Sequence, residues 1–143
     1  MKPFFLFFFL LCSCKSNSRV LNVWIENNSD ANKNIEISTY VNDSLIDKRS
    51  ITKDSIADRV SIFKVDLKFP DTTRRCVLKF VSSSRGEETS CLVIADSLNK
   101  RTLAHVNYVE RLFKKGDEYN FIVLKKDTVV RKEFYCEMLY HLR

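Results

Sequence analysis

The sequence contains very little glycine and proline. Two glycines and two prolines in 143 residues exclude collagen-like repeats and proline-rich low-complexity chains. The sequence has no glycine-rich phosphate loop and no Gly-x-Ser-x-Gly turn of the kind that carries a nucleophilic serine. The chain therefore lacks the motifs that mark nucleotide-binding proteins with a phosphate loop and the common serine hydrolases.

Metal-ligating and catalytic patterns are also scarce. His105 and His141 are the only histidines, and no HxH, HxxxH or CxxC spacing accompanies them, so we expect no metal and no cofactor. The paired carboxylates Glu87-Glu88 and Asp117-Glu118 fall at expected turns, where solvated charge explains them. We therefore predict no catalytic residues and no enzyme activity.

Only one long apolar run occurs, at the N-terminus. Residues 1–14 read MKPFFLFFFLLCSC, in which Lys2 precedes nine apolar residues, 4–12. Nine helical residues at 1.5 Å each cross less than half of a bilayer core of ~30 Å. The run is too short for a transmembrane helix and matches the apolar region of a secretory signal peptide.

The residues that end this run resemble a bacterial lipobox. Leu11-Cys12-Ser13-Cys14 has leucine at −3, a small residue at −1 and cysteine at +1. Cys12 is a poor alternative anchor, because bulky Leu11 would then stand at −1. The resemblance implies cleavage after Ser13, a diacylglyceryl thioether on Cys14 and acylation of the freed amine. Two or three acyl chains anchor a protein stably, whereas one binds marginally.

The resemblance to a lipoprotein divides the chain into three parts. Residues 1–13 are the expected signal peptide, 14–19 a polar tether and 20–143 a single β-sandwich domain. The tether lacks the acidic patch of many surface-exposed lipoproteins from Bacteroidetes-type bacteria. We therefore expect a lipid-anchored protein of the cell envelope, on the outer membrane and facing the periplasm.

The net charge of +6 does not indicate nucleic-acid binding. Cleavage before Cys14 removes only Lys2 and leaves 23 basic and 18 acidic side chains. These charges alternate along the chain, and the longest basic runs are pairs such as Lys114-Lys115. Such a pattern is typical of a mixed, solvated surface, so we expect no nucleic acid among the partners.

Short alternating segments separated by turn residues dominate the rest of the chain. This pattern predicts an all-β fold, an antiparallel β-sandwich of about seven to nine strands. The expected strands cover 20–26, 34–41, 45–51, 60–69, 75–81, 89–95, 119–124 and 128–139. Turns are expected at Asn27–Asp30, Asn42–Ser44, Arg85-Gly86, Lys115-Gly116 and Lys126-Asp127.

One segment, 96–115, fits two structures. Ala104, Val106 and Tyr108 alternate as in a strand. Leu103, Val106, Val109 and Phe113 also fit one face of a helix, with Gly116 as its C-cap. We favour the strand and keep a helix within 98–115 as the alternative.

Two hairpin registers follow from the expected turns. A two-residue turn at Arg85-Gly86 would place Cys76 opposite Ala95, and Cys91 opposite Phe80. A turn at Lys126-Asp127 would place Val123 opposite Val130, and Tyr119 opposite Phe134.

Two sequence stretches resemble known sandwich modules. The first reads V-x-I-x-N-x-S from Val23, and the second reads I-x-I-x-x-Y-V-N-D-S-L-I from Ile35. Together they resemble immunoglobulin-like or transthyretin-like β-sandwiches, which are common in envelope lipoproteins. The resemblance covers most of residues 20–140 and implies a fold, but no functional residues.

Three cysteines remain after the signal peptide and the lipid site. Cys76, Cys91 and Cys136 are candidates for one disulfide in an oxidising compartment, with one thiol left over. The expected hairpin register disfavours a bond between Cys76 and Cys91, so pairing of either with Cys136 is at least as good. Three buried free cysteines are the favoured alternative, because all three alternate with apolar neighbours.

A short motif recurs more often than chance predicts. Asp followed by Ser or Thr and then by an apolar residue or Thr occurs five times. It resembles the O-glycosylation motif of Bacteroidetes envelope proteins, and Asp-Ser or Asp-Thr also initiates ordinary turns. The resemblance implies glycan at Ser44, Ser55, Thr72, Ser97 and Thr128.

These observations give three hypotheses for function. The leading one is a non-enzymatic binding or accessory lipoprotein with a protein or glycan partner, engaged for example by strand addition at a sheet edge. The second is a structural component of an envelope or surface assembly. The third and weakest is a glycan-active hydrolase, which would require two carboxylates in a deep pocket. Trp24 on the first strand is a candidate sugar-stacking residue, although such a residue more often covers a core or sheet.

Overall fold

The computed structural model describes residues 18–29, 34–52, 57–69, 73–83, 86–116, 118–119, 122–123 and 128–140. Of these, residues 112–114, 118–119, 122–123 and 128–131 are described by their backbone alone. The strands are β1 (Ser18–Asn27), β2 (Ile35–Val41), β3 (Ser44–Ile51), β4 (Val60–Lys68), β5 (Arg75–Ser82), β6 (Glu87–Ile94), β7 (Leu103–Lys114), β8 (Glu118–Tyr119), β9 (Ile122–Val123) and β10 (Thr128–Leu139). Two 3-10 turns, η1 (Ala57–Arg59) and η2 (Ala95–Ser97), lie between strands.

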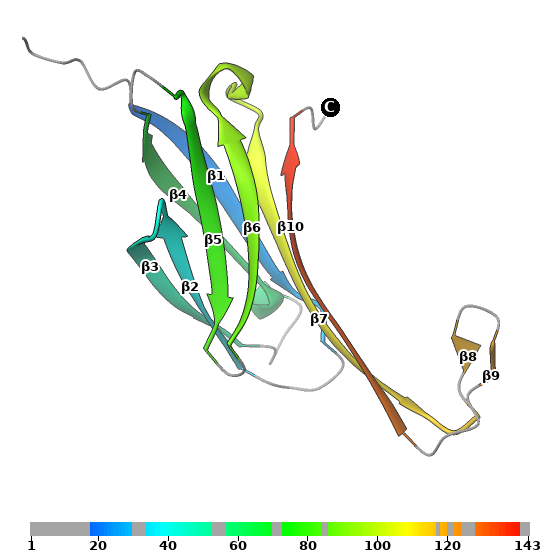
Figure 1. Cartoon of the computed structure of the whole chain (residues 1–143). Coiled ribbons are helices and arrows are strands. Elements are labelled where there is room, and N and C mark those ends of the chain that lie inside the picture. The colour runs from blue at the N-terminus through cyan, green and yellow to red at the C-terminus, as the bar shows by residue number, and fades with distance from the viewer. Residues whose placement is uncertain are drawn as a thin grey trace, which may run out of the picture.

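The strands form two four-stranded sheets packed face to face (Figure 1). Sheet A has the order β10-β7-β1-β4, and sheet B has the order β3-β2-β5-β6. All pairs within them are antiparallel except β1 with β7, which is parallel. The predicted all-β sandwich is therefore confirmed.

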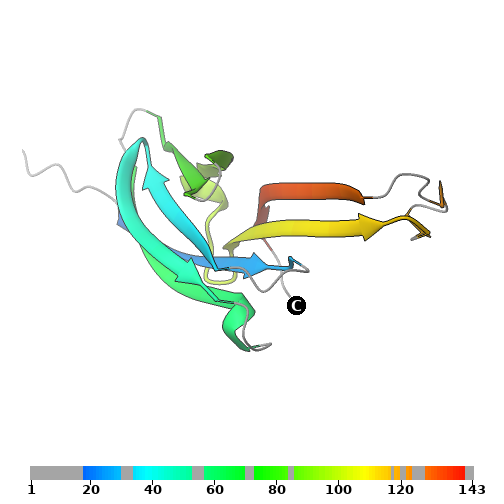
Figure 2. The same cartoon turned by 90° about the horizontal axis from the view of Figure 1, so that it is seen from below.

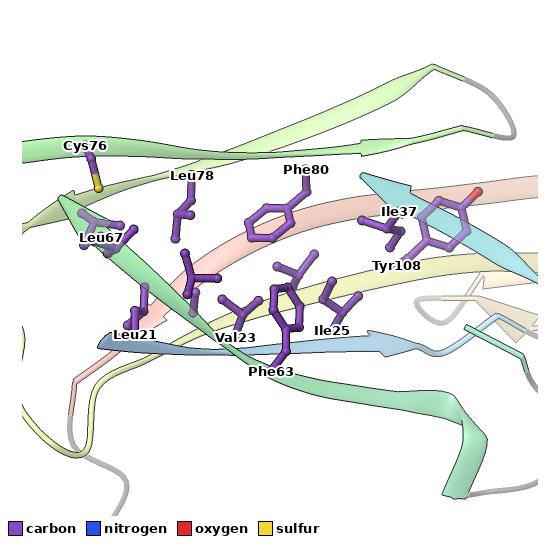
Figure 3. Close-up of a cluster of buried hydrophobic side chains, with 14 of the residues drawn as sticks. Leu21, Val23, Ile25, Ile37, Phe63, Leu67, Cys76, Leu78, Phe80 and Tyr108 are labelled. Carbon is purple, nitrogen blue, oxygen red and sulfur yellow. The ribbon is translucent and has the colours of Figure 1, made fainter. Parts of the chain in front are cut away.

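Alternate residues of the central strands fill the space between the sheets (Figure 3). Leu21, Val23 and Ile25 of β1 have no exposed surface, while their neighbour Trp24 is half-buried on the outer side. Burying one such aliphatic side chain stabilises the fold by about 1.5–3 kcal/mol. The remainder of the core comes mainly from Ile37, Phe63, Val65, Leu67, Leu78, Phe80, Val93, Val106 and Tyr108.

The segment that fits both helix and strand patterns is the strand β7. Its even-numbered residues Ala104, Val106 and Tyr108 are buried, whereas Leu103 is half-buried. As a strand the segment pairs with β1 on one side and β10 on the other. The helical alternative for 98–115 is wrong, because only a strand satisfies both neighbouring ladders and this alternating burial.

The β2–β3 hairpin has the turn that the sequence predicts. Val41 pairs with Ser44 across Asn42-Asp43, whose φ angles are 45° and 66°. Two consecutive positive φ angles define the type I′ turn, which matches the twist of the flanking strands. The Asn42 Oδ1 also accepts a hydrogen bond from the Val77 N–H at 3.0 Å, so the turn is tied to β5.

The predicted β5–β6 register is wrong by two residues. Ser82 pairs with Glu87, so the loop has four residues rather than two. Gly86 closes it with φ +67° and donates its N–H to the Ser82 carbonyl at 2.9 Å. Gly86 adopts the expected positive φ angle, but it does so at the end of a longer loop. Cys91 consequently lies opposite Leu78 rather than opposite Phe80.

The predicted pairing across Lys126-Asp127 is also wrong. β10 returns to β7, so Val130 lies opposite Leu112 and Phe134 opposite Tyr108. Residues 118–119 pair instead with 122–123 as the small β8–β9 sheet. The reason is length, because two 12-residue strands form a much longer ladder together than either could with that short segment. Lys126 and Asp127 lie outside the described residues.

The arrangement of strands differs from the immunoglobulin order. In immunoglobulin domains the first two strands share a sheet, whereas here β1 lies in sheet A and β2 in sheet B. The resemblance to transthyretin-like modules stays a prediction. Among the described residues, no helix has the length and apolar character that crossing a membrane requires.

Candidate functional site

The described chain begins at one end of sheet A and projects beyond its other end. β1 and β7 run in the same direction, and β1 stops at Asn27, opposite Tyr108. β7 continues through residues 109–114, accompanied by residues 128–133 of β10. We call these two segments the arm, and at 3.3 Å per residue they extend about 20 Å beyond the last paired residue of β1. Figure 2 shows the arm leaving the body of the molecule.

Buried polar contacts hold the root of the arm. The Asn28 N–H donates to the Tyr108 carbonyl at 2.8 Å, and the Glu110 N–H donates to Ser29 Oγ at 3.0 Å. Ser29 is only 1% exposed, and its own N–H donates to Asn27 Oδ1 at 3.1 Å. These bonds extend the contact between β1 and β7 past the last paired residue. The arm therefore leaves the sandwich in a defined direction.

One edge of the arm has no described strand beside it. The backbone groups of Tyr108 and Glu110 point toward β1, and in a strand every second residue points the same way. The N–H and C=O of Leu112 therefore point to the same edge, past the end of β1. Within the described ranges no strand pairs with β7 there.

The arm also brings two arginines together. Arg111 of β7 lies directly opposite Arg131 of β10 in the ladder, and the Arg111 side chain is exposed. Directly opposite residues of an antiparallel pair share one face, where like charges repel. The next pair toward the sandwich is Glu110 with Lys132, and the next pair on the same face as Arg111 is Val109 with Glu133.

A disulfide joins the two sheets beside the root of the arm. Cys91 of β6 bonds to Cys136 of β10, with 5.7 Å between their Cα atoms. Close by, Lys132 Nζ lies 3.7 Å from a carboxylate oxygen of Glu87, again linking β10 to β6. One side of the sandwich is thus closed covalently. The third candidate, Cys76, is a free cysteine and 2% exposed.

A second group of polar and aromatic side chains lies on the outer face of sheet A. We call this group the His105 cluster; it consists of Trp24, Glu26, His105, Tyr135 and Glu137. The His105 Nδ1 lies 3.1 Å from Glu137 Oε1, and its Nε2 lies 3.2 Å from Glu26 Oε2. A protonated ring donates to both carboxylates, and a neutral ring to only one. The imidazole thereby bridges β1 and β10 across β7.

Aromatic rings flank the histidine of this cluster. Trp24 and Tyr135 meet His105 edge to face, with centroid separations of 6.0 and 6.5 Å. The Tyr135 hydroxyl also accepts from Asn107 Nδ2 at 2.9 Å. Trp24 therefore covers the outside of sheet A, and its buried Nε1 has no hydrogen-bond partner among the described residues. Most polar atoms of the cluster bond to each other, so its clearest role is to brace three strands.

A shallow cavity of about 240 Å³ lies on the side opposite the disulfide, between the edge strands β3 and β4. The Arg49 guanidinium lies 4.1 Å from the centroid of Phe63, and its Nε lies 2.6 Å from Asp47 Oδ2. Charged residues that point inward protect a sheet edge from unwanted pairing. The cavity is lined by Ile46, Asp47, Arg49, Phe63, Lys64, Val65 and Asp66.

The hydrolase hypothesis requires two carboxylates in a deep pocket. The lining of this cavity contains two carboxylates, Asp47 and Asp66. Asp47 is engaged by Arg49, and the cavity is open rather than deep. Among the described residues, no group of three or more His, Cys, Asp or Glu side chains could hold a metal ion. That the chain is not an enzyme stays a prediction.

The modification sites expected from the sequence are only partly described. Ser44 at the start of β3 and Ser97 in η2 are exposed. Thr128 begins β10, where the backbone alone is described. Cys14, Ser55 and Thr72 lie outside the described residues, as does the segment 1–13 that is the expected signal peptide. The last two residues of the expected tether, Ser18 and Arg19, belong to β1, so β1 begins two residues earlier than expected.

The chain matches no family model, no curated protein and no solved structure in comparisons with each of them. Its fold and contacts alone define its class: a two-sheet β-sandwich with an intersheet disulfide and a projecting two-stranded arm. The arm and the His105 cluster were missed by sequence reasoning. The length of the apolar and charged segment 103–114 could have indicated a strand longer than the sandwich needs, but the ladder partners of His105 are set by tertiary pairing.

Proposed function

We propose that the protein is a membrane-anchored envelope lipoprotein with a non-enzymatic binding role, attached through Cys14 and engaging its partner with the arm. The observation that carries this proposal is that the start of β1 and the arm lie at opposite ends of sheet A. β1 starts at the end of sheet A opposite the arm. An acyl chain on Cys14, four residues before Ser18, would hold that end near the bilayer and direct the arm away from it.

The disulfide supports an envelope location. Disulfides persist in the periplasm and outside the cell, and are rare in the reducing cytosol. The Cys91–Cys136 bond therefore agrees with export by the expected signal peptide. The exposed Ser44 and Ser97 are accessible acceptors if the Asp-Ser motif carries O-glycan. The intact mass of native mature protein would reveal such glycan as mass beyond peptide plus lipid.

Membrane fractionation of cells that produce the full chain tests the anchor. We expect the wild type in the membrane fraction with a lipid-modified mature N-terminus, and Cys14→Ala as an uncleaved, unacylated precursor. Cys12→Ala is the matched control, because it changes a neighbouring cysteine and should leave processing unchanged. A mature, acyl-free Cys14→Ala protein that stays in membranes would show that the anchor is elsewhere.

The arm also bears on the second hypothesis, a structural component of an envelope assembly. A free strand edge can pair with a neighbouring subunit as well as with a binding partner. Analytical ultracentrifugation of the detergent-solubilised protein separates the two roles. Concentration-dependent growth beyond a dimer would favour the structural role, whereas a constant mass favours the binding role.

A further inference from the structure

We propose that the arm binds an extended, acidic segment of a partner protein, which adds as a strand along the free edge of β7 and places carboxylates near Arg111 and Arg131. This inference rests on the binding role proposed for the arm and names the class of partner. It combines two independent features of the arm, its open hydrogen-bonding edge and its opposed arginines.

The opposed arginines indicate the charge of the partner. Arg111 and Arg131 are cross-strand neighbours, and such like-charged pairs destabilise a sheet. A two-stranded ribbon is marginally stable in water on its own, so an unfavourable pair is costly here. A partner carboxylate beside the exposed side chain of Arg111 would add a charge-assisted interaction at this position of the ladder.

The free edge indicates that the partner is an extended chain. Leu112 directs its N–H and C=O to the side where β1 has ended. In strand addition, main-chain hydrogen bonds supply affinity and alternate side chains supply specificity. Residues 109–114 contain neither proline nor glycine, so nothing in the strand itself opposes a third strand.

Two edge strands of the sandwich, β3 and β10, carry features that hinder the addition of a further strand. β3 directs Asp47 and Arg49 inward beside the shallow cavity. β10 is flanked by β6, to which Cys136 is covalently bonded. Inward charges and a covering element are both ways in which proteins block edge pairing. The edge of β7 beyond Glu110 has no such protection among the described residues.

Geometry and charge disfavour two other occupants. Antiparallel pairing of two arms from two copies would point their β1 starts in opposite directions, which disfavours this pairing for two copies anchored by that end in one membrane. The anchoring bilayer itself lies at the far end of β1 from the arm. A partner protein with an acidic segment remains, because it can approach the arm from the side away from the membrane.

Fluorescence anisotropy with defined peptides tests the proposal on the detergent-solubilised mature protein. The probe is a labelled heptapeptide that alternates valine and glutamate, and the comparison peptide alternates valine and lysine. We expect the acidic peptide to bind at least tenfold more tightly. Equal binding of both peptides, or none of either, would overturn the proposal.

Charge reversal tests the role of the arginines. The double substitution Arg111→Glu and Arg131→Glu should weaken binding of the acidic peptide at least 30-fold. The matched control is Lys64→Glu with Lys68→Glu, which makes the same change in net charge on exposed positions of β4 and should change affinity less than threefold. Equal losses in both variants would mean that general electrostatics, not the arm, binds the peptide.

A proline tests strand addition. Leu112→Pro removes the N–H on the free edge and leaves the hydrogen bonds between β7 and β10 in place, so we expect at least a tenfold loss of affinity. Leu112→Val keeps the N–H and should bind as the wild type does. An acidic peptide with N-methyl groups on alternate residues gives the same test without changing the protein. Undiminished binding of that peptide would exclude strand addition.

Two further outcomes would assign the arm to another partner. Binding to phosphatidylglycerol vesicles that the arginine substitutions abolish, with no peptide binding, would identify a lipid surface. A dimer that dissociates in the Leu112→Pro variant, again with no peptide binding, would identify a second copy of the chain as the partner of the arm. Neither result affects the fractionation of Cys14→Ala, so failure of this inference and failure of the anchor are distinguishable.

Discussion

Cys76 illustrates how one buried side chain acquires its chemistry from the core. It lies on β5 facing sheet A, is 2% exposed and forms no disulfide. Desolvation of the thiolate raises the pKa of Cys76 from 9.0 to about 11. The thiolate is the reactive form of cysteine, so this thiol should be inert toward alkylating reagents in the folded protein at neutral pH.

The same shift predicts a loss of stability in alkali. The folded state keeps the Cys76 thiol protonated until about pH 11, whereas the unfolded chain ionises from about pH 9. The stabilising contribution is complete below pH 9 and disappears as the pH rises toward 11, at up to about 1.4 kcal/mol per pH unit. Urea unfolding at pH 7.5 and pH 10.5 should show a smaller pH dependence for Cys76→Ala than for the wild type. Identical pH dependence in both proteins would contradict this assignment.

His105 should contribute to stability through its two carboxylates. His105→Ala removes the bridge between Glu26 and Glu137 and leaves two negative groups near each other. We expect a loss of about 1.5–3 kcal/mol, the range for hydrogen bonds to charged groups. His105→Gln retains an amide donor and should lose less. Thermal unfolding measures both, and equal losses would show that ring packing against Trp24 matters more than the bridge.

At the scale of elements, alternation predicts the strands well and their partners poorly. The limits of β2, β3 and β5 agree with expectation to within a residue or so, because burial on one face repeats every two residues. Register depends on loop length, and a single glycine does not determine it. Gly86 takes the expected positive φ, yet it ends a four-residue loop and shifts Cys91 by two positions.

The disulfide should be the strongest single connection between elements. Cys91 and Cys136 are 45 residues apart in the sequence, so their bond restricts a long loop in the unfolded chain. Replacing both with alanine should lower the free energy of unfolding by about 2–4 kcal/mol. Cys76→Ala is the control, and only the double variant should become insensitive to dithiothreitol. A wild type that is equally stable with and without reductant would contradict this prediction.

Across the whole molecule, sequence reasoning predicted the sandwich but neither the arm nor the His105 cluster. The alternation of apolar residues implies two sheets around a core, which Leu21, Ile37 and Phe80 confirm. The arm exists because β7 continues past the end of β1. The sequence does not show this, because it depends on the pairing of Asn27, the last residue of β1, with Tyr108 in β7. The His105 cluster likewise depends on which strands become neighbours, which no local pattern specifies.

The sandwich should fold without residues 110–132, because the buried apolar side chains of the described residues lie outside that range. Buried apolar residues come from β1 to β7 up to Val109 and are completed by Phe134, Cys136 and Met138 of β10. Replacing residues 110–132 by Asn-Gly would join Val109 to Glu133, a directly opposite pair, through a type I′ turn. We expect this shortened protein to keep the disulfide and to melt cooperatively within a few degrees of the wild type.

The same shortened protein separates folding from binding. It should lose all affinity for the acidic valine–glutamate peptide, because both the free edge of β7 and Arg111 are gone. A second deletion that removes only residues 117–126 is the matched control, since it shortens the chain beyond the tip and leaves the described arm strands intact. Unfolding of the 110–132 deletion would mean that the arm contributes to the core. Retained peptide binding would mean that the binding surface lies on the sandwich itself, where the shallow cavity beside Arg49 would be the next place to test.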